Sequence, residues 1–341
     1  MAKSFSVAVS QNSNEDVEKF IQLRTGFVPP PNILQLAQVQ NRQADLVNYY
    51  LDKERVAALL AASPSERAGA VKQLDRSTAM RLSAENVPEA LRQQFDLAAQ
   101  KPLAVDPKAR KVDLRTIGIV TPIKDQGQCG SCWAFGTLAA FESSYARTNK
   151  QKLIDCSEQC LLNCSGAGTC QGGFWASKYL RDDGVASERD YKYMANDAQC
   201  LGSVSRPYRA VNFGWVSASQ DVPTVDEIKA AIAIHGAIAA AVRVTPSMVR
   251  FLRNRQAGVV FAEDEKGPVN HAIALVGWDD DKGAWLVKNS WGKQMGEDGY
   301  FYIKYGINNI GFGAQWIDAQ NEALKVSSVA LGALLEDTSP K

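Results

Sequence analysis

The sequence predicts an α+β protein, in which a helical N-terminal segment precedes a helix-rich half and then a strand-rich half. Apolar residues recur at helical spacing through residues 32–62 and again from the cysteine at position 132. Strand patterns dominate from residue 238 to residue 317, including continuously apolar runs. All seven cysteines lie between Cys129 and Cys200, so the first hundred residues differ in composition from the rest of the chain. We therefore expect an active-site cleft between the two halves.

Length and charge exclude several classes of protein. The chain has 341 residues, enough for two or three domains, with 38 basic and 37 acidic side chains. This near-neutral balance lacks the basic footprint of proteins that bind nucleic acid or anionic membranes. No apolar run reaches the roughly 18 residues that span a bilayer. We expect neither a nucleic-acid partner nor a membrane partner, and Met1–Val9 is too short and mixed for a signal peptide.

The N-terminal segment is predicted to be helical up to about residue 99. A short helix is expected over Glu15–Leu23, and the prolines after Phe27 end it because proline lacks an N–H. A longer helical pattern follows over residues 32–62. Further helices are predicted over 66–80, where Ser63 and Pro64 resemble an N-terminal cap, and over 83–99. This segment has no cysteine, tryptophan or histidine, so it carries no obvious catalytic group.

The second part of the chain is predicted to contain both helices and strands, with strands dominating toward its end. A helix starts at Cys132, because apolar residues follow it at helical spacing. The other predicted elements are a strand at 213–216, a helix at 225–235, a strand at 238–244, and a hairpin whose strands at 272–278 and 284–289 flank a turn at 279–283.

The stretch from Gln126 to Phe135 delivers Cys132 to the start of this helix through a glycine-rich approach. Unpaired backbone N–H groups and the positive end of the helix dipole at that place favour thiolate over thiol. Because the thiolate is the nucleophile, this position suits a catalytic cysteine. The alternative is a buried or disulfide-bonded cysteine in a tight turn.

A cysteine nucleophile needs a base, and the chain has two histidines. His235 lies between a helix and an apolar strand and is interpreted as structural. His271 begins the predicted hairpin, and Asn289 ends it. The midpoint between them is residue 280, inside the turn, so their side chains can face each other. Asn289 can then orient the imidazole, although a simple strand-end cap is the alternative interpretation.

Three sequence blocks together resemble the papain-like cysteine proteases, the group that includes the cathepsins. They are Gln126–Phe135, Val269–Gly277 and Trp285–Gly292, within a similarity from about residue 112 to 316. The resemblance implies a two-subdomain fold with the active-site cleft between a helical first half and a β-rich second half. It further implies a monomer that acts on an extended polypeptide without metal or cofactor. Leu114 stands where the family usually has tryptophan.

The resemblance also implies roles for individual residues. Cys132 would be the nucleophile, His271 the base, Asn289 its orienting partner, and Gln126 an oxyanion donor beside the Cys132 N–H. Trp291 would shield the His–Asn contact from water. Other positions would bind substrate: Gly172 and Gly173 by strand-like hydrogen bonds, and Phe174, Ala241 and Val269 as pocket walls, with Trp175 in place of the usual proline. Asp318 would fall near the pocket base, where a carboxylate would favour a basic side chain, although a surface aspartate is the simpler interpretation.

Cysteine usage favours an oxidising compartment, so we expect a secreted protein or another oxidising location. The resemblance implies pairs Cys129–Cys170 and Cys164–Cys200. Cys156 and Cys160 remain, and they could form an additional Cys156–Cys160 disulfide if Ser157 starts a helix with Cys156 outside it. Zinc binding by these closely spaced cysteines is the alternative, but the spacing is uncommon for zinc and no histidine is near. We therefore expect no metal site.

We divide the chain into a helical N-terminal segment (1–108), a catalytic domain (109–320) and a C-terminal tail (321–341). The resemblance implies that the first is a propeptide that inhibits the enzyme intramolecularly, with its tail running through the cleft in the non-productive direction. It lacks the interspersed Glu-Arg-Phe-Asn-Ile-Asn pattern of many family pro-segments. An independent helical domain is the alternative. Residues 103–111 are polar and contain a proline, as expected of an exposed processing site.

The expected function is therefore that of a cysteine endopeptidase, made as an inactive zymogen and acting through an acyl-enzyme. Two alternatives remain open. An exopeptidase or peptide ligase could use the same catalytic residues and would differ from an endopeptidase only in loops that block part of the cleft. A catalytically silent homologue could act as a binding protein, but such proteins usually lack the nucleophile or the base.

Overall fold

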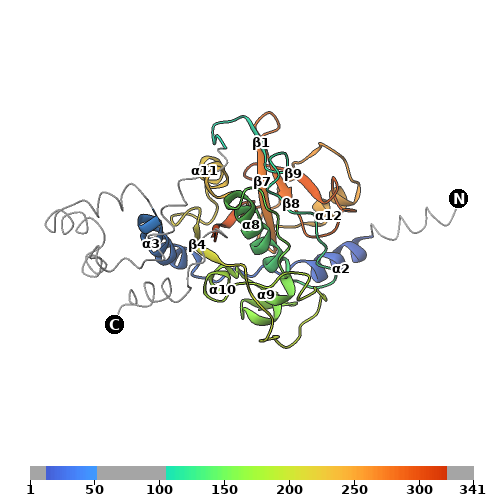
Figure 1. Ribbon diagram of the computed structural model, residues 1–341. Helices are drawn as coiled ribbons and strands as arrows, with labels where there is room; N and C mark the ends of the chain where they lie inside the picture. Colours follow the sequence, from blue (N-terminus) through green and yellow to red (C-terminus); the bar gives the residue numbers. More distant parts are fainter. Residues whose placement is uncertain (1–12, 52–104, 321–341) are drawn as a thin grey trace, which may run out of the picture.

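The computed structural model describes residues 13–51 and 105–320 of the chain (Figure 1). The predicted helices at 66–80 and 83–99, the end of the helix predicted at 32–62, and the tail 321–341 lie outside the described residues. Among the helices that are described, none combines the length and apolarity that crossing a membrane requires.

One eight-stranded sheet forms the second half of the fold. Its neighbouring strands are antiparallel except the pair β6–β9. The order across the sheet is β4 (Ala210–Trp215), β10 (Phe312–Ala319), β5 (Ile238–Val242), β7 (His271–Asp279), β8 (Ala284–Lys288), β9 (Tyr300–Lys304) and β6 (Val260–Phe261), and β1 (Lys111–Asp113) pairs with β7. Every residue of β7 is buried, which explains its continuously apolar sequence.

Helix α8 (Cys132–Thr148) lies beside the sheet and contacts β7, β10 and β5 (Figure 1). Nearly all of its side chains are buried, so it is a core helix rather than an amphipathic surface helix. The other elements of the first half are short: α9 (Glu158–Cys164), the hairpin of β2 (Gly168–Thr169) and β3 (Gly172–Gly173), and α10 (Ser177–Asp182). The helix-rich first half and strand-rich second half confirm the predicted α+β fold.

Two helices of the second half show how local capping sets element ends. Helix α11 (Val225–His235) has the predicted bounds, because Thr224 and Glu227 form a capping box and Gly236, with φ 93°, ends the helix. Helix α12 (Pro246–Arg253) was not predicted. Its start signal was present in the sequence, since Thr245 caps it and Pro246 occupies the first turn.

The N-terminal segment packs on both sides of the catalytic part. Helix α2 (Asn14–Arg24) confirms the short predicted helix and lies against α12, where Arg253 pairs with Asp16 at 2.7 Å. Helix α3 (Ile33–Leu51) lies beside β4, and Asn41 hydrogen-bonds both the N–H and the carbonyl of Trp215. Figure 1 shows the two helices at opposite ends of the catalytic part. The chain between them must therefore cross from one side to the other.

Candidate active site

Cys132 is the first residue of α8, as predicted, and its side chain is fully buried. Ser131 stands at the N-cap position, but its side chain makes no hydrogen bond to the helix. The first amides of α8 are thus free of the side-chain cap that a serine at this place usually provides. An oxyanion or a thiolate could use these amides instead.

His271 and Asn289 meet at the open end of the β7–β8 hairpin. Nε2 of His271 lies 2.9 Å from Oδ1 of Asn289. The predicted contact is present, although the predicted symmetry about residue 280 is wrong. The strands pair Ala274 with Lys288, and the register shifts between Leu275 and Gly277. Asn289 reaches His271 because it lies just past the end of β8, where its side chain is not confined to the pleat.

The imidazole is held in place by more than Asn289. The ring of Trp291 lies 4.4 Å from that of His271, centroid to centroid, so it covers the His–Asn contact. Nδ1 of His271 is buried and has no hydrogen-bond partner among the described residues. With Nε2 engaged by Asn289, this unpartnered nitrogen is the one available for exchanging a proton.

Gln126 is fully buried and lies at the centre of a hydrogen-bond network. Its Oε1 accepts from Ser290 Oγ at 2.7 Å, and its backbone N–H donates to the Ser290 carbonyl at 2.9 Å. Its Nε2 donates to the Cys129 carbonyl at 2.7 Å and to the Arg24 carbonyl at 3.2 Å. The side-chain amide therefore faces the loop before α8 and already binds one peptide carbonyl of the N-terminal segment.

Burial controls the charge of the two reactive groups in this state. Burial raises the pKa of the Cys132 thiol from 9.0 to about 12, although nearby backbone N–H groups of Ala272 and Gly26 act in the opposite direction. Burial lowers the pKa of His271 from 6.5 to about 4, against the effect of the Asn289 hydrogen bond. The thiol and the imidazole are therefore both neutral at pH 7 while the site is closed.

Residues 24–28, which we call the cleft segment, close the site. Phe27 forms a parallel bridge with Gly173. Val28 N–H donates to the Gly173 carbonyl at 2.9 Å, and Gly173 N–H donates to the Gly26 carbonyl at 2.8 Å. On the other side, the N–H groups of Gly26 and Phe27 both donate to the Asn270 carbonyl at 2.9 Å. The segment thus crosses between β3 and the residue before β7, directly over Cys132.

Comparison with known proteins agrees with this geometry. The profile described as papain family cysteine protease matches residues 108–319. The chain belongs to the papain family of cysteine proteases. Solved structures of the family share the fold. The bromelain protease of Ananas comosus in complex with the E64 inhibitor aligns with a TM-score of 0.54 and 28% sequence identity. The alignment covers 61% of this chain and 98% of the bromelain chain. Digestive procathepsin L 3 of Tenebrio molitor aligns with TM-score 0.54 and 30% identity, covering 64% and 71%.

Relatives of known sequence match over a similar part of the chain. Pro-cathepsin H of Mus musculus is 35% identical over 222 residues, which are 61% of this chain and 64% of that protein. Digestive cysteine proteinase 1 of Homarus americanus is 36% identical over 215 residues, 60% of this chain and 64% of that protein. The match therefore spans a little under two thirds of these relatives.

Several of the residues expected to bind substrate contact Phe27 of the cleft segment. Gly172 and Gly173 form β3, and Gly173 pairs with the segment as described. Phe27 is buried, with its ring 5.3 Å from Phe174 and 4.5 Å from Trp175. Ala241 and Val269 are buried in the same apolar cluster. Phe27 thus packs against Phe174 and Trp175, two positions of this papain-family chain that were expected to shape the pocket.

Asp318 does not belong to this pocket, and the prediction that placed it at the pocket base is wrong. Its Oδ1 lies 2.7 Å from Nδ1 of His235, whose ring stacks on Trp316. Ile317 and Ala319 are the residues of β10 that are buried in the same apolar cluster as Phe27. Neighbouring residues of a strand point to opposite faces, so a slip of one position exchanged an acid for an apolar side chain. His235 lies outside the site.

Two of the three expected disulfides are formed, Cys129–Cys170 and Cys164–Cys200. The third, Cys156–Cys160, is wrong, because both residues are buried free thiols. Ser157 does cap α9 by accepting from Cys160 N–H at 3.0 Å, as the prediction required. However, Cys156 is held elsewhere, by a backbone bridge to Ser187 and by an N–H bond to Glu142.

Sequence patterns did not predict which residues of the N-terminal segment enter the cleft. We expected its tail, close to the catalytic domain, but residues 24–28 lie there. A signal was present, because Gly26 and Phe27 stand between the end of a helix and a proline run. A short extended segment has no periodicity, however, so its pattern does not indicate a partner.

Proposed function

We propose that this papain-family chain is a cysteine endopeptidase made as a zymogen, with Cys132, His271, Asn289 and Gln126 as its catalytic residues. The observation that carries the proposal is the His271–Asn289 contact, which leaves the buried Nδ1 of His271 unpartnered among the described residues. The backbone N–H of Ala272, the residue after His271, acts on the thiol of Cys132 at the start of α8. A merely structural histidine would have both ring nitrogens satisfied when it is this deeply buried. All four residues that a silent homologue would lose are present.

In the proposed reaction, the Cys132 thiol gives its proton to His271, and the thiolate attacks the carbonyl carbon of a peptide bond. The imidazolium then returns the proton to the leaving amine as the carbon–nitrogen bond breaks, which leaves a thioester on Cys132. Water attacks the thioester while His271 takes its proton, and the thiol is regenerated with release of the acid. Asn289 keeps the imidazole oriented throughout.

The tetrahedral intermediate requires donors for its negative oxygen, and Gln126 Nε2 and Cys132 N–H are the proposed pair. The Arg24 carbonyl supports this assignment, because it accepts from Gln126 Nε2 at 3.2 Å and from Trp291 Nε1 at 3.3 Å. A carbonyl oxygen of the cleft segment thus occupies a place where a peptide oxygen can be bound. No metal or cofactor enters this scheme.

We further propose that residues 1–108 are a pro-segment, that residues 109–320 are the catalytic domain, and that the cleft segment is the intramolecular inhibitor. The segment is bound by Gly173 on one side and by the Asn270 carbonyl on the other, so a substrate cannot reach the cleft while the segment is in place. The two disulfides favour an oxidising compartment for the protein.

Product analysis tests the activity. After acid treatment to release the N-terminal segment, the chain should cleave a peptide that is blocked at both termini, giving two internal fragments by mass spectrometry. A peptide that is trimmed only when its termini are free would favour an exopeptidase. Products joined to an added amine would favour a ligase. No cleavage of any peptide, with Cys132 intact and reduced, would contradict the proposal.

The closed state should weaken as the pH falls. The pKa of His271 is about 4 when buried, against 6.5 for an accessible imidazole, so the open form binds more protons between these values. Occlusion is therefore fully stabilised above about pH 6.5 and is progressively lost toward pH 4. At pH 5 the free energy that favours the closed state over the open one should be smaller by about 2 kcal/mol, because each unit of pKa difference corresponds to 1.36 kcal/mol. Hydrogen exchange of residues 24–28, corrected for intrinsic rates, should show falling protection in this range.

The control for this experiment is His271→Gln, with Cys132→Ala in both chains to prevent self-cleavage. Glutamine does not titrate, so the fall in protection between pH 6.5 and pH 4 should be much smaller. Asp16 and Asp125, which pair with Arg253 and Arg24, are kept in both chains and contribute equally. An unchanged pH profile in His271→Gln would show that other groups control the opening.

A further inference from the structure

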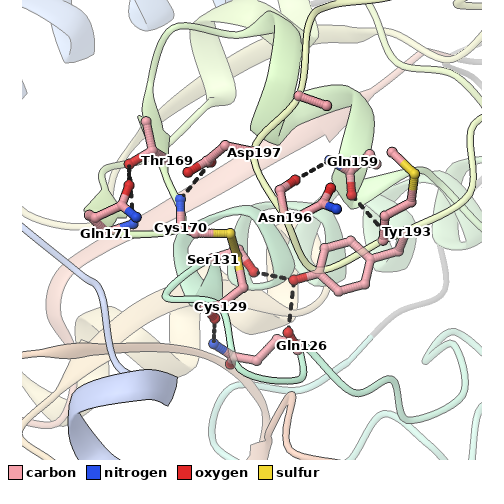
Figure 2. The surroundings of a disulfide bond; sticks show 12 residues. Gln126, Cys129, Ser131, Gln159, Thr169, Cys170, Gln171, Tyr193, Asn196 and Asp197 are labelled. Carbon is pink, nitrogen blue, oxygen red and sulfur yellow. Dashed lines mark hydrogen bonds between the residues drawn. A yellow bond between two sulfur atoms is a disulfide. The ribbon is translucent and has the colours of Figure 1, made fainter.

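Tyr193 lies beside the loop that leads from Gln126 to Ser131, directly before the nucleophile (Figure 2). Its hydroxyl is 2.8 Å from the Gln126 carbonyl and 2.6 Å from Ser131 Oγ. The ring packs edge-to-face on Phe135 of α8, with centroids 5.0 Å apart. One side chain therefore touches the backbone of the proposed oxyanion donor and the residue directly before the proposed nucleophile.

The direction of these two hydrogen bonds follows from the number of protons. A carbonyl oxygen can only accept, so the single proton of the Tyr193 hydroxyl goes to Gln126. Ser131 must then be the donor in its bond with Tyr193. Burial raises the pKa of Tyr193, so the phenol keeps its proton at neutral pH. The order of donation is thus Ser131 to Tyr193 to Gln126.

The contact with Tyr193 accounts for the missing cap on α8, because it holds the Ser131 side chain in an orientation in which its oxygen does not reach the helix amides. A serine at the N-cap normally turns its oxygen toward the first helix amides, and Ser131 does not. Its hydroxyl is instead committed to Tyr193, 62 residues further along the chain. Without Tyr193, the oxygen would be free to turn toward the amides of α8. It would then accept from the N–H of Trp133, the second amide of α8, and this would displace the Ser131–Cys132 peptide whose N–H is a proposed oxyanion donor.

Tyr193 is itself held firmly. Its N–H donates to Glu188 Oε1 at 2.8 Å, and the next amide, that of Met194, donates to Gln159 Oε1 at 2.8 Å. Figure 2 shows Gln159 also bound to Asn196 of the same loop. Asp197 then accepts from the N–H of Cys170, the disulfide partner of Cys129. The loop of Tyr193 is therefore joined to the nucleophile loop at several points.

We propose that Tyr193 is a positioning residue for the oxyanion site, which fixes the Gln126 backbone and keeps Ser131 away from the first amides of α8. The inference rests on the proposed peptidase function. Its consequence is specific: loss of the hydroxyl should weaken transition-state stabilisation more than substrate binding, because the contacts of the substrate with β3 and the pocket are elsewhere.

The test is Tyr193→Phe in the acid-activated chain, with active sites titrated by a thiol-directed epoxide. We expect kcat to fall by roughly tenfold to a hundredfold, which is no more than the fall in kcat caused by removing an oxyanion donor. KM should stay within about twofold of the wild-type value. The affinity for a peptide aldehyde, whose adduct places an oxyanion in the site, should fall by a similar factor. Adding Ser131→Ala to Tyr193→Phe should restore part of kcat, because the chain then has no Ser131 hydroxyl that could bond the amides of α8.

The matched control is Tyr191→Phe. Tyr191 is also buried, but its hydroxyl bonds Asn163 at 2.7 Å and the Gln199 carbonyl at 3.3 Å, away from the nucleophile loop. This variant should keep its kcat. The inference would be overturned if the two variants had equal kinetics, or if Ser131→Ala did not relieve the defect of Tyr193→Phe. Either result would leave the proposed peptidase function standing. A wild-type chain without peptidase activity would overturn the proposed function and this inference with it.

Discussion

Replacement of Cys132 with alanine should lower kcat/KM for a peptide substrate by about 10⁴-fold or more. The reason is that alanine leaves the oxyanion donors and the pocket in place but removes the only atom that forms the acyl-enzyme, and residual catalysis then comes from binding alone. Cys132 is fully buried at the start of α8, but the replacement removes a single sulfur atom, and the small cavity that it leaves should not unfold the protein. The measurement is steady-state hydrolysis of a fluorogenic peptide after acid activation with an external protease.

The control is Cys156→Ala. Cys156 is also a buried free thiol, but it lies beside Glu142 and Lys124 rather than at the helix N-terminus. Its replacement should leave kcat/KM within a few-fold of the wild-type value. Comparable losses in the two variants would mean that the effect of Cys132→Ala is structural, and substantial activity in Cys132→Ala would refute the assigned nucleophile.

Replacement of Gly26 with valine should convert the uncleaved chain into an open enzyme. A Cβ atom at Gly26 would lie 2.0 Å from the Gly130 carbonyl oxygen, and backbone atoms cannot move aside as a flexible side chain could. The cleft segment therefore cannot keep its path over Cys132. If opening becomes easier by about 3 kcal/mol, the initial activity of the intact chain should rise by about 100-fold, at 1.4 kcal/mol per factor of ten.

Two further variants make this result interpretable. Gly202→Val is the matched control, because a Cβ at Gly202 meets open space, and it should leave the intact chain inactive. Phe27→Ala should act in the same direction as Gly26→Val, since removal of a buried aromatic side chain costs about 3–5 kcal/mol. Intact mass must show uncleaved chains during the assay. Inactive Gly26→Val and Phe27→Ala chains that activate normally once cleaved would show that other residues close the site.

Most of the fold could be predicted, because its signals are local. Helix α11 begins at a capping box and ends at Gly236, and both signals are contained in the sequence. The hairpin from His271 to Asn289 has apolar strands and a polar turn, so its existence was clear. Its register was not, since the shift between Leu275 and Gly277 depends on how neighbouring strands pack rather than on the hairpin itself.

The errors concern contacts between distant parts of the chain. Asp318 and Ile317 differ by one position, yet a strand sends them to opposite faces, and only the pairing of β10 with its neighbours decides which faces the pocket. Cys156 was paired with Cys160 because these two remained after the other disulfides were assigned, whereas the backbone of Cys156 is held by Ser187. The cleft segment has no pattern of its own, and its place depends on β3 and Asn270.

The central claim is that Cys132 is a reactive thiol covered by residues 24–28. The most direct measurement is residue-resolved alkylation by iodoacetamide at pH 7, comparing the intact wild-type chain with intact Gly26→Val. Cys156 and Cys160, both buried free thiols, serve as internal references. We expect Cys132 to react as slowly as these two in the wild type and far faster than they do in Gly26→Val. Rapid alkylation of Cys132 in the intact wild type, or equally slow alkylation in both chains, would contradict the claim.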